Sequence, residues 1–142
     1  MTDLILMGGG GHCRSAIDVI EAEGLQANAL QVGTYAQDGL RRLAERYSDI
    51  GDVRGYGLFF GAEFVSDPAT KAPATGYVTA LANAMRHRGV LLNKLGIHYN
   101  TLKVRPPLPF SRENADLMLE TLEDALAALG PVGDFVDPEV AA

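Results

Sequence analysis

The sequence predicts an α/β domain of the two-layer α+β type, in which a small, mostly antiparallel sheet of about three strands has helices packed on one face. From residue 25 onward the spacing of apolar residues changes between helical and strand periods in the order helix, strand, helix, strand, strand, helix. The last two strands are separated by only about eight residues, which favours an antiparallel pair. Each helical stretch has one apolar stripe that must be buried, and the sheet is the natural partner.

Composition limits the chain to one compact domain. It has 142 residues, 47% of them hydrophobic and 21% charged, and a net charge of -6. This acidic balance argues against nucleic acid as the main partner but leaves small anions open. The single cysteine, Cys13, excludes an internal disulfide. With no signal-like start and no apolar run near the ~20 residues that span a bilayer, we expect a cytoplasmic protein without a membrane segment.

The first 24 residues predict a strand, a glycine-rich turn and a helix. Leu4–Met7 is the expected strand, and the helix extends to about Glu23 before Gly24 ends it. Backbone amides at the start of a helix can face a phosphate, so the turn is a possible phosphate-binding loop. The other interpretation is a turn that binds nothing. The candidate residues are Gly9, Gly10, Gly11 and His12.

A second helix follows and extends to about Tyr47, after which the period changes to that of a strand over Val53–Val65. The bulky side chains of this stretch alternate with small ones, which predicts one bulky face. That face consists of Tyr56, Leu58, Phe60, Ala62 and Phe64. The three glycines on the other face imply that another backbone, a helix or a ligand approaches closely, and helix packing is the commoner explanation.

A polar connection over 66–76 leads to an amphipathic helix around 78–85, which a basic triplet and Gly89 end. The sequence then predicts a short strand at Val90–Leu92, a loop over 93–100 and a strand at Thr101–Arg105.

Two prolines end the last strand because proline cannot donate to a sheet ladder. Ser111 then offers its oxygen to the first amides of a final helix, which continues to about Leu129. Residues 131–142 have no usable period and are predicted to be a loose tail.

Lys103 and Arg105 are the candidate binding residues. Side chains two positions apart on a strand share a face, so the two cations should lie side by side at the strand end. They suit an anionic ligand, although a salt-bridged surface strand is the commoner explanation for such a pair. An ammonium group binds phosphate or carboxylate as a point charge, whereas planar bidentate recognition calls for arginine. Arg54 is expected to hold neighbouring backbone or a carboxylate rather than a substrate.

The sequence predicts neither a catalytic residue nor a metal site. His87 and His98 lie apart from each other and from any cysteine or carboxylate cluster at ligand spacing.

Residues 18–129 resemble the C-terminal small domain of class III pyridoxal-phosphate-dependent aminotransferases, through four blocks in series. The blocks are 18–33, the stretch I-G-D-V-R-G-Y-G-L-F-F-G-A-E at 50–63, R-G-V-L-L at 88–92 and Y-N-T-L-K-V-R-P-P-L at 99–108. The sequence around Lys103 is most similar to that of the branch that includes phosphoethanolamine phospho-lyases. The resemblance implies pyridoxal phosphate as cofactor, a small amine as substrate, and a homodimer or a missing large domain as partner. It also implies that Lys103 holds a substrate carboxylate or phosphate, with Arg105 behind it or in a structural pair.

The resemblance lacks the large domain that carries the Schiff-base lysine and the acid at the pyridinium nitrogen. The chain has three lysines, Lys71, Lys94 and Lys103, and none matches the cofactor lysine. We therefore expect the family's amino-group transfer or phospho-lyase chemistry to be missing from this chain alone. A third interpretation is a structural subunit that depends on a partner.

Residues 1–21 resemble instead the start of the sugar O-acyltransferases related to sialic-acid O-acetyltransferases, although the hexapeptide repeats of that family are not found here. The predicted organisation is thus a separate segment at 1–24, an aminotransferase-like domain at 25–130 and a tail at 131–142, as in a natural fusion or a truncated product. The alternative function is a small phosphate or nucleotide-sugar binding module that uses the Gly8–His12 turn.

Overall fold

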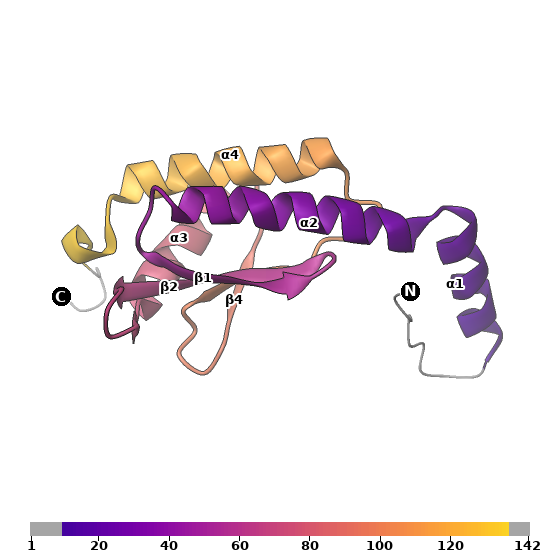
Figure 1. Cartoon of the computed structure of the whole chain (residues 1–142), viewed down its shortest axis with the longest axis horizontal. Helices are drawn as coiled ribbons and strands as arrows, with labels where there is room; N and C mark the ends of the chain where they lie inside the picture. Colours follow the sequence, from indigo (N-terminus) through magenta and orange to yellow (C-terminus); the bar gives the residue numbers. More distant parts are fainter. Residues whose placement is uncertain (1–9, 137–142) are drawn as a thin grey trace.

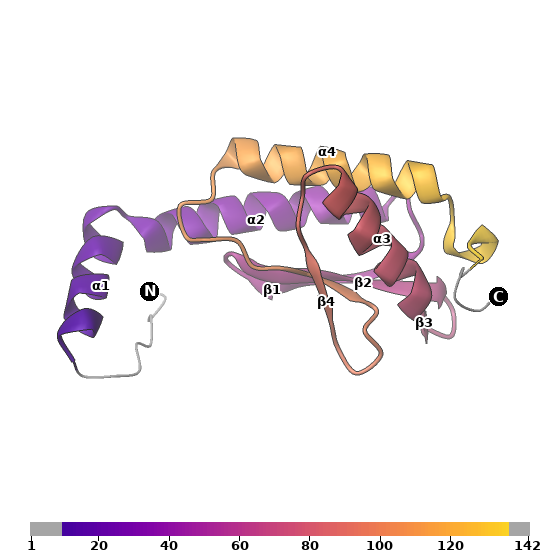
Figure 2. The same ribbon diagram turned by 180° about the vertical axis from the view of Figure 1, so that it is seen from behind.

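The computed structural model describes residues 10–136 and confirms the predicted α+β class. Its helices are α1 (Gly11–Ala22), α2 (Leu25–Ala44), α3 (Thr75–His87), α4 (Arg112–Leu129) and the short 3₁₀ helix η1 (Val132–Asp134). Its strands are β1 (Ile50–Tyr56), β2 (Phe59–Asp67), β3 (Ala72–Pro73), β4 (Asn93–Leu95) and β5 (Thr101–Val104). Helices α2, α3 and α4 gather on one side of the sheet, and α1 extends beyond its end (Figures 1 and 2). No helix in the described part is long and apolar enough to cross a membrane.

The sheet is antiparallel and has the order β1-β2-β5-β4, with the two-residue strand β3 paired to the far end of β2. The predicted antiparallel pairing of the last two strands is confirmed. Strand β5 comes from late in the sequence but lies between β2 and β4, so the segment with Lys103 has a neighbouring strand on each side.

The single strand predicted over Val53–Val65 is wrong, because the chain reverses there into the hairpin of β1 and β2. Tyr56 pairs with Phe59 across a two-residue turn, and Gly57 takes the positive φ of 51° that such a turn favours at its first position. The reversal leaves Tyr56 60% exposed, although it was predicted on the bulky face. Within β2 the predicted alternation is correct from Phe60 to Phe64, with Phe60, Ala62 and Phe64 buried, but it breaks at Val65, which is buried as well.

Helix α2 lies directly against the hairpin turn, and glycines make this approach possible. A Cβ atom on Gly33 would lie 2.0 Å from the carbonyl oxygen of Gly57. The same carbonyl accepts a hydrogen bond from Nε2 of the buried Gln37 (3.3 Å). The close approach expected at a glycine of this region is therefore made, at Gly57, by a helix.

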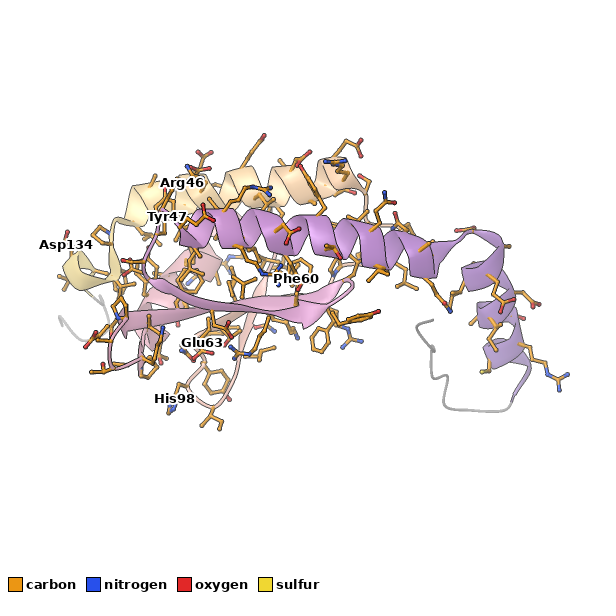
Figure 3. All side chains as sticks on the ribbon, in the orientation of Figure 1. Arg46, Tyr47, Phe60, Glu63, His98 and Asp134 are labelled. Carbon is orange, nitrogen blue, oxygen red and sulfur yellow. The ribbon has the colours of Figure 1, made fainter. Side chains whose placement is uncertain are left out.

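The core lies between the sheet and the three helices, and Figure 3 shows Phe60 on the helix side of β2 and Glu63 on the other. The largest fully buried side chains are Phe64, Leu40, Leu81, Met85, Leu102, Leu122 and Leu126. The predicted cap of the last helix is confirmed: Ser111 Oγ accepts a hydrogen bond from the Asn114 backbone amide (3.2 Å), and Asn114 Oδ1 accepts one from the Ser111 backbone amide (3.2 Å).

Three segments differ from the predictions: Val90–Leu92, the loop over 93–100 and the polar connection over 66–76. The strand predicted at Val90–Leu92 is irregular backbone, and β4 begins at Asn93, inside the predicted loop. The reason is local, because the Val90 amide bonds to Met85 O and completes the end of α3 (3.0 Å). The polar connection contains strand β3.

The described part of the predicted loose tail is ordered against the core. Val132 donates its amide to the Asp49 carboxylate (2.9 Å), and the Phe135 ring contacts Tyr77 edge-on with centroids 5.4 Å apart. Residues 137–142 lie outside the described range, as do the predicted strand Leu4–Met7 and the first glycines of the turn.

Candidate functional site

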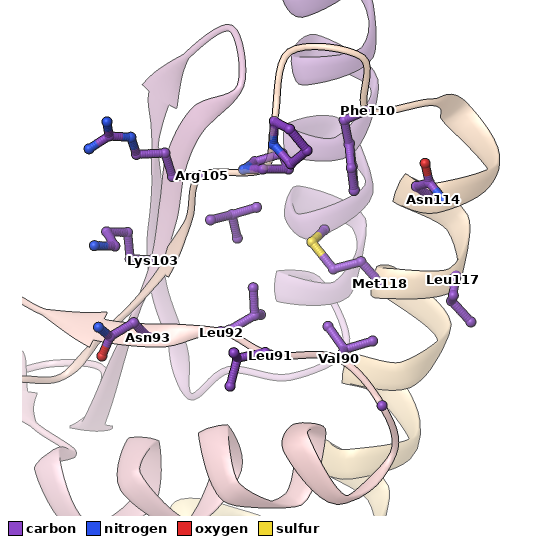
Figure 4. A pocket seen from close by; sticks show the side chains of 14 residues that line it. Val90, Leu91, Leu92, Asn93, Lys103, Arg105, Phe110, Asn114, Leu117 and Met118 are labelled. Atoms are coloured by element: carbon purple, nitrogen blue, oxygen red, sulfur yellow. The ribbon is translucent and has the colours of Figure 1, made fainter.

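The two candidate cations lie on the sheet face that is turned away from the helices. Leu102 and Val104 of β5 are buried in the core, so the alternation of the strand turns Lys103 to the opposite face. Figure 4 shows Lys103 and Arg105 pointing the same way, as their two-residue spacing predicts. Lys103 is half-buried and Arg105, just beyond the strand end, is exposed.

Lys103 has a small neighbour on one side and a polar neighbour on the other. It pairs with Gly61 of β2 and with Asn93 of β4. Gly61 has no side chain to cover the lysine, and a Cβ atom there would lie 2.9 Å from the carbonyl oxygen of Leu102. The sheet packing therefore keeps one flank of Lys103 bare.

The carboxylates of this face are bound to Arg54 rather than to Lys103. Arg54 donates to Asp52 (2.6 Å) and Glu63 (2.5 Å), and these hydrogen bonds, to Asp52 first, raise its pKa above the ordinary value. Asn100 also donates to Glu63, at 3.4 Å. The predicted structural role of Arg54 agrees with these contacts.

Lys103 and Arg105 remain without an acidic partner. Among residues 10–136, no hydrogen bond or ion pair reaches the Lys103 ammonium group, and the contact of the Arg105 guanidinium is the Phe59 ring, 6.0 Å from its centroid. The salt-bridged surface strand, which was the commoner explanation for such a pair, is therefore not what the structure shows. Two uncompensated cations on a rigid strand can attract an anion.

Asn93 belongs to the same face, and the sequence analysis missed it because it fell in a predicted loop. Its Oδ1 accepts the amide of Lys94 (2.8 Å), so the other end of the side chain, Nδ2, remains as a donor. Figure 4 shows Asn93 on the same side of the sheet as Lys103 and Arg105. No sequence signal marks this residue, since its place depends on the register of β4 against β5.

An open cleft of about 780 Å³ lies between β5 and α4. Its wall is mainly apolar and includes Val90, Leu92, Phe110 and Met118, and Asn93, Lys103 and Arg105 also line it. In Figure 4 the cations point away from Phe110 and Met118. The lining of the cleft thus continues from its apolar wall to the cations at the edge of β5.

A tether holds the chain segment that follows Arg105. Nδ2 of Asn28 in α2 donates to the carbonyl oxygens of Leu108 (2.8 Å) and Phe110 (3.0 Å). The three prolines of this segment have no amide to donate, and the Asn28 side chain supplies the donor for two of its carbonyl oxygens. The position of the Arg105 backbone therefore depends on α2 as well as on the sheet.

The glycine turn is only partly described. Gly9 lies outside the described residues, whereas Gly10, Gly11 and His12 are exposed, with Gly10 preceding α1 without a side-chain cap. Its proposed phosphate-binding role stays a prediction. His87 and His98 are exposed on α3 and in the β4–β5 loop, and the absence of a metal site also stays a prediction.

Comparison with known proteins links the fold to one family. Residues 12–126 match the model of the family described as aminotransferase class-III. The alanine–glyoxylate aminotransferase 2 homolog 2, mitochondrial, of Arabidopsis thaliana is 39% identical over 115 residues, which are 81% of this chain and 24% of that protein.

Two solved structures are similar in fold and sequence. A phospholyase from Arthrobacter in complex with phosphoethanolamine superposes with a TM-score of 0.78 at 41% identity, over 83% of this chain and 28% of the other. An amine transaminase from an uncultivated Pseudomonas species, in the PLP-bound internal aldimine form, gives a TM-score of 0.74 at 36% identity, over 89% and 30%. The chain therefore spans about a quarter of the length of the relatives it matches.

The described residues do not by themselves form a pyridoxal phosphate site. Such a site needs a lysine for the Schiff base and an acid for the pyridinium nitrogen in one cavity. Lys71 is exposed in a turn, and Lys94 donates to the Thr79 hydroxyl (2.6 Å). Of the three cavities found in residues 10–136, none is lined by both a lysine and a carboxylate. The fit of these residues to the cofactor is therefore incomplete.

Proposed function

The chain belongs to the class III aminotransferases, and we propose that it contributes the end of the active site that binds the anionic group of a small amine substrate. Lys103 makes the principal contact in this proposal and Arg105 assists it. The anion is a phosphate, as in the phospho-lyase branch, which the sequence around Lys103 resembles. The complete reaction is amino-group transfer or phospho-lyase chemistry that depends on pyridoxal phosphate.

The observation that carries the proposal is the uncompensated charge of Lys103. On a face where Asp52 and Glu63 are both bound by Arg54, the lysine has no acidic partner among the described residues. An ammonium group left in this state, half-buried between two strands, is more useful for binding than for stability. The bare flank at Gly61 gives an anion access to it.

The proposal assigns the chemistry that requires the cofactor to residues other than those described here. Because none of the three cavities described above combines a lysine with a carboxylate, we expect the chain alone to bind the substrate's anion without converting the substrate. Mixing it with pyridoxal phosphate and an amino donor should give no protein-bound aldimine absorbance and no transamination. Turnover that depends on Lys71 or Lys94 would contradict this part of the proposal.

The partner in this proposal is a larger domain, or a second subunit, that covers the apolar side chains beside the site. Ile97 is 93% exposed and Leu91 80% exposed, and both flank β4. Exposed apolar groups concentrated in one region are typical of surfaces that another protein covers.

The test is a titration of the purified chain with phosphoethanolamine, followed by backbone amide shifts in two-dimensional NMR. Shifts should concentrate at Lys103, Arg105 and their strand neighbours, and Lys103→Met should remove them while the melting temperature stays unchanged. Lys71→Met removes the same charge from an exposed turn and serves as the control. Equal binding by Lys103→Met and the unmodified chain would reject the site.

The resemblance of residues 1–21 to sugar O-acyltransferases, and the nucleotide-sugar module built on it, stay predictions. The aminotransferase family match begins at residue 12 and so includes most of α1. Titration with a nucleotide-sugar is the direct test of that second function.

A further inference from the structure

We propose that Asn93 is a third binding residue of the anion site, and that its side-chain amide makes the site prefer a phosphate monoester to a carboxylate. This inference rests on the proposed function, because it assumes that Lys103 and Arg105 bind the anion of the substrate. It adds a residue that the sequence did not indicate.

Asn93 is the cross-strand partner of Lys103 in the β4–β5 ladder. Side chains at directly opposed positions of an antiparallel pair have their Cβ atoms about 4.5–5.5 Å apart and share a face. Figure 4 shows the side chains of Asn93, Lys103 and Arg105 extending to the same side of the sheet.

The Oδ1 atom of Asn93 accepts the Lys94 amide at 2.8 Å, which directs the acceptor end of the side chain to its own backbone. The donor end, Nδ2, has no hydrogen-bond partner within residues 10–136. Asn93 therefore presents to this face the part of an amide group that an anion can use.

The side chains of Lys103, Arg105 and Asn93 offer donors, and none of them offers a free acceptor to the ligand. A phosphate monoester has three diverging terminal oxygens and up to two negative charges, whereas a carboxylate has two oxygens in one plane. Three donors from three positions suit three oxygens, and a carboxylate bound by the two cations leaves the amide unused. Arg54 binds the nearby carboxylates of Asp52 and Glu63 and offsets one of their two charges, which reduces their repulsion of a phosphate.

The experiment compares inorganic phosphate with acetate at equal ionic strength, by NMR titration of the full chain. The test variant is Asn93→Val, which removes the donor without changing charge and keeps a residue that favours strands. Asn83→Val makes the same substitution at an exposed position of α3 and is the matched control. We expect Asn93→Val to weaken phosphate binding about fivefold, the value of one net hydrogen bond, and acetate binding less than twofold.

The possible results separate this inference from the proposed function. A selective loss for phosphate supports the role of Asn93, provided that the melting temperatures of the variants agree. Equal losses for both anions, or no loss, would overturn it while Lys103→Met can still show that the cationic site exists. If Lys103→Met binds both anions as the unmodified chain does, the proposed function fails and this inference fails with it.

Discussion

The two faces of the sheet differ in character: one packs against the helices, and the other carries the charged side chains. On the helix side, Phe60, Phe64 and Leu102 are each no more than 3% exposed, and the polar groups there have partners. On the open side, Arg54 holds two carboxylates while Lys103 and Arg105 hold none among the described residues. Packing is thus complete on one face, whereas charge is left unpaired on the other. Substitutions on the first face should change stability, and those on the second should change binding.

The largest effect on stability is expected from Phe64→Ala. The ring is fully buried beside Tyr77, so its removal leaves a cavity in the core and should cost about 3–5 kcal/mol of unfolding free energy in urea titration. Phe59→Ala is the matched control on the open face, where the ring is 58% exposed, and it should cost less than about 1 kcal/mol. Similar losses for the two variants would remove the distinction between the faces.

The next effect is expected from Gly33→Ala, which tests the contact between α2 and the hairpin turn. The new methyl group would meet backbone, at 2.0 Å from Gly57 O, and backbone cannot move aside as a side chain can. We expect a loss of about 3 kcal/mol by thermal or urea unfolding, the upper end for overpacking. Gly133→Ala has open space around the added atom and should be nearly neutral. A stable Gly33→Ala variant would mean that the helix lies farther from the turn.

A smaller effect should appear in alkali, through the buried phenol of Tyr77. Burial, with a further contribution from the Asp49 charge, raises its pKa from 10.0 to about 12. The folded chain thus binds this proton more tightly than the unfolded chain does, so the stabilisation is complete below pH 10 and is lost as the pH rises to about 12. The loss amounts to about 2.7 kcal/mol, at roughly 1.36 kcal/mol for each of about two pKa units.

Tyr77→Phe should remove this part of the pH dependence, as measured by urea unfolding between pH 9 and pH 12. At neutral pH the variant loses the hydrogen bond to Gly130 O (2.8 Å), worth about 1 kcal/mol. A variant with the same alkaline slope as the unmodified chain would assign that slope to other groups.

The smallest effect on stability is expected from Lys103→Met, although the same change should abolish anion binding. The lysine has no ion pair to lose within residues 10–136, so the unfolding free energy should change by less than about 0.5 kcal/mol. Arg54→Met is the comparison on the same face, because it releases Asp52 and Glu63 and gives Lys103 a carboxylate to pair with. It should weaken phosphate binding without touching the ligand, as measured by the same NMR titration. A large loss of stability in Lys103→Met would indicate a structural role.

The pattern of the sequence correctly predicted features that depend on neighbouring residues. The shared face of Lys103 and Arg105 follows from the two-residue repeat of any strand, and the cap at Ser111 follows from the chemistry of its side chain. The family resemblance, carried by linked blocks, agreed with the match over residues 12–126.

Features that depend on register or on a change of direction were missed. In this sequence large and small residues continue to alternate through the two-residue turn, so Val53–Val65 has the pattern of one strand, although the turn places Tyr56 on the same face as Phe59 and not Phe60. Asn93 has no local signal, because its place beside Lys103 comes from pairing between segments. The ordered end at Phe135 depends on a contact with Tyr77, which is far away in sequence. Such relations are set by tertiary packing rather than by local preference.

The tether from Asn28 gives the domain a mechanical property. Its amide joins the start of α2 to the segment between Arg105 and α4, through the two carbonyl oxygens of Leu108 and Phe110. That segment contains three prolines, which have no amide to donate, so few backbone hydrogen bonds fix its position. The first turns of α2 and the backbone beyond Arg105 are therefore joined directly. We expect a shift of α2 to change the position of the Arg105 cation, although that cation lies on the face of the sheet that α2 does not cover.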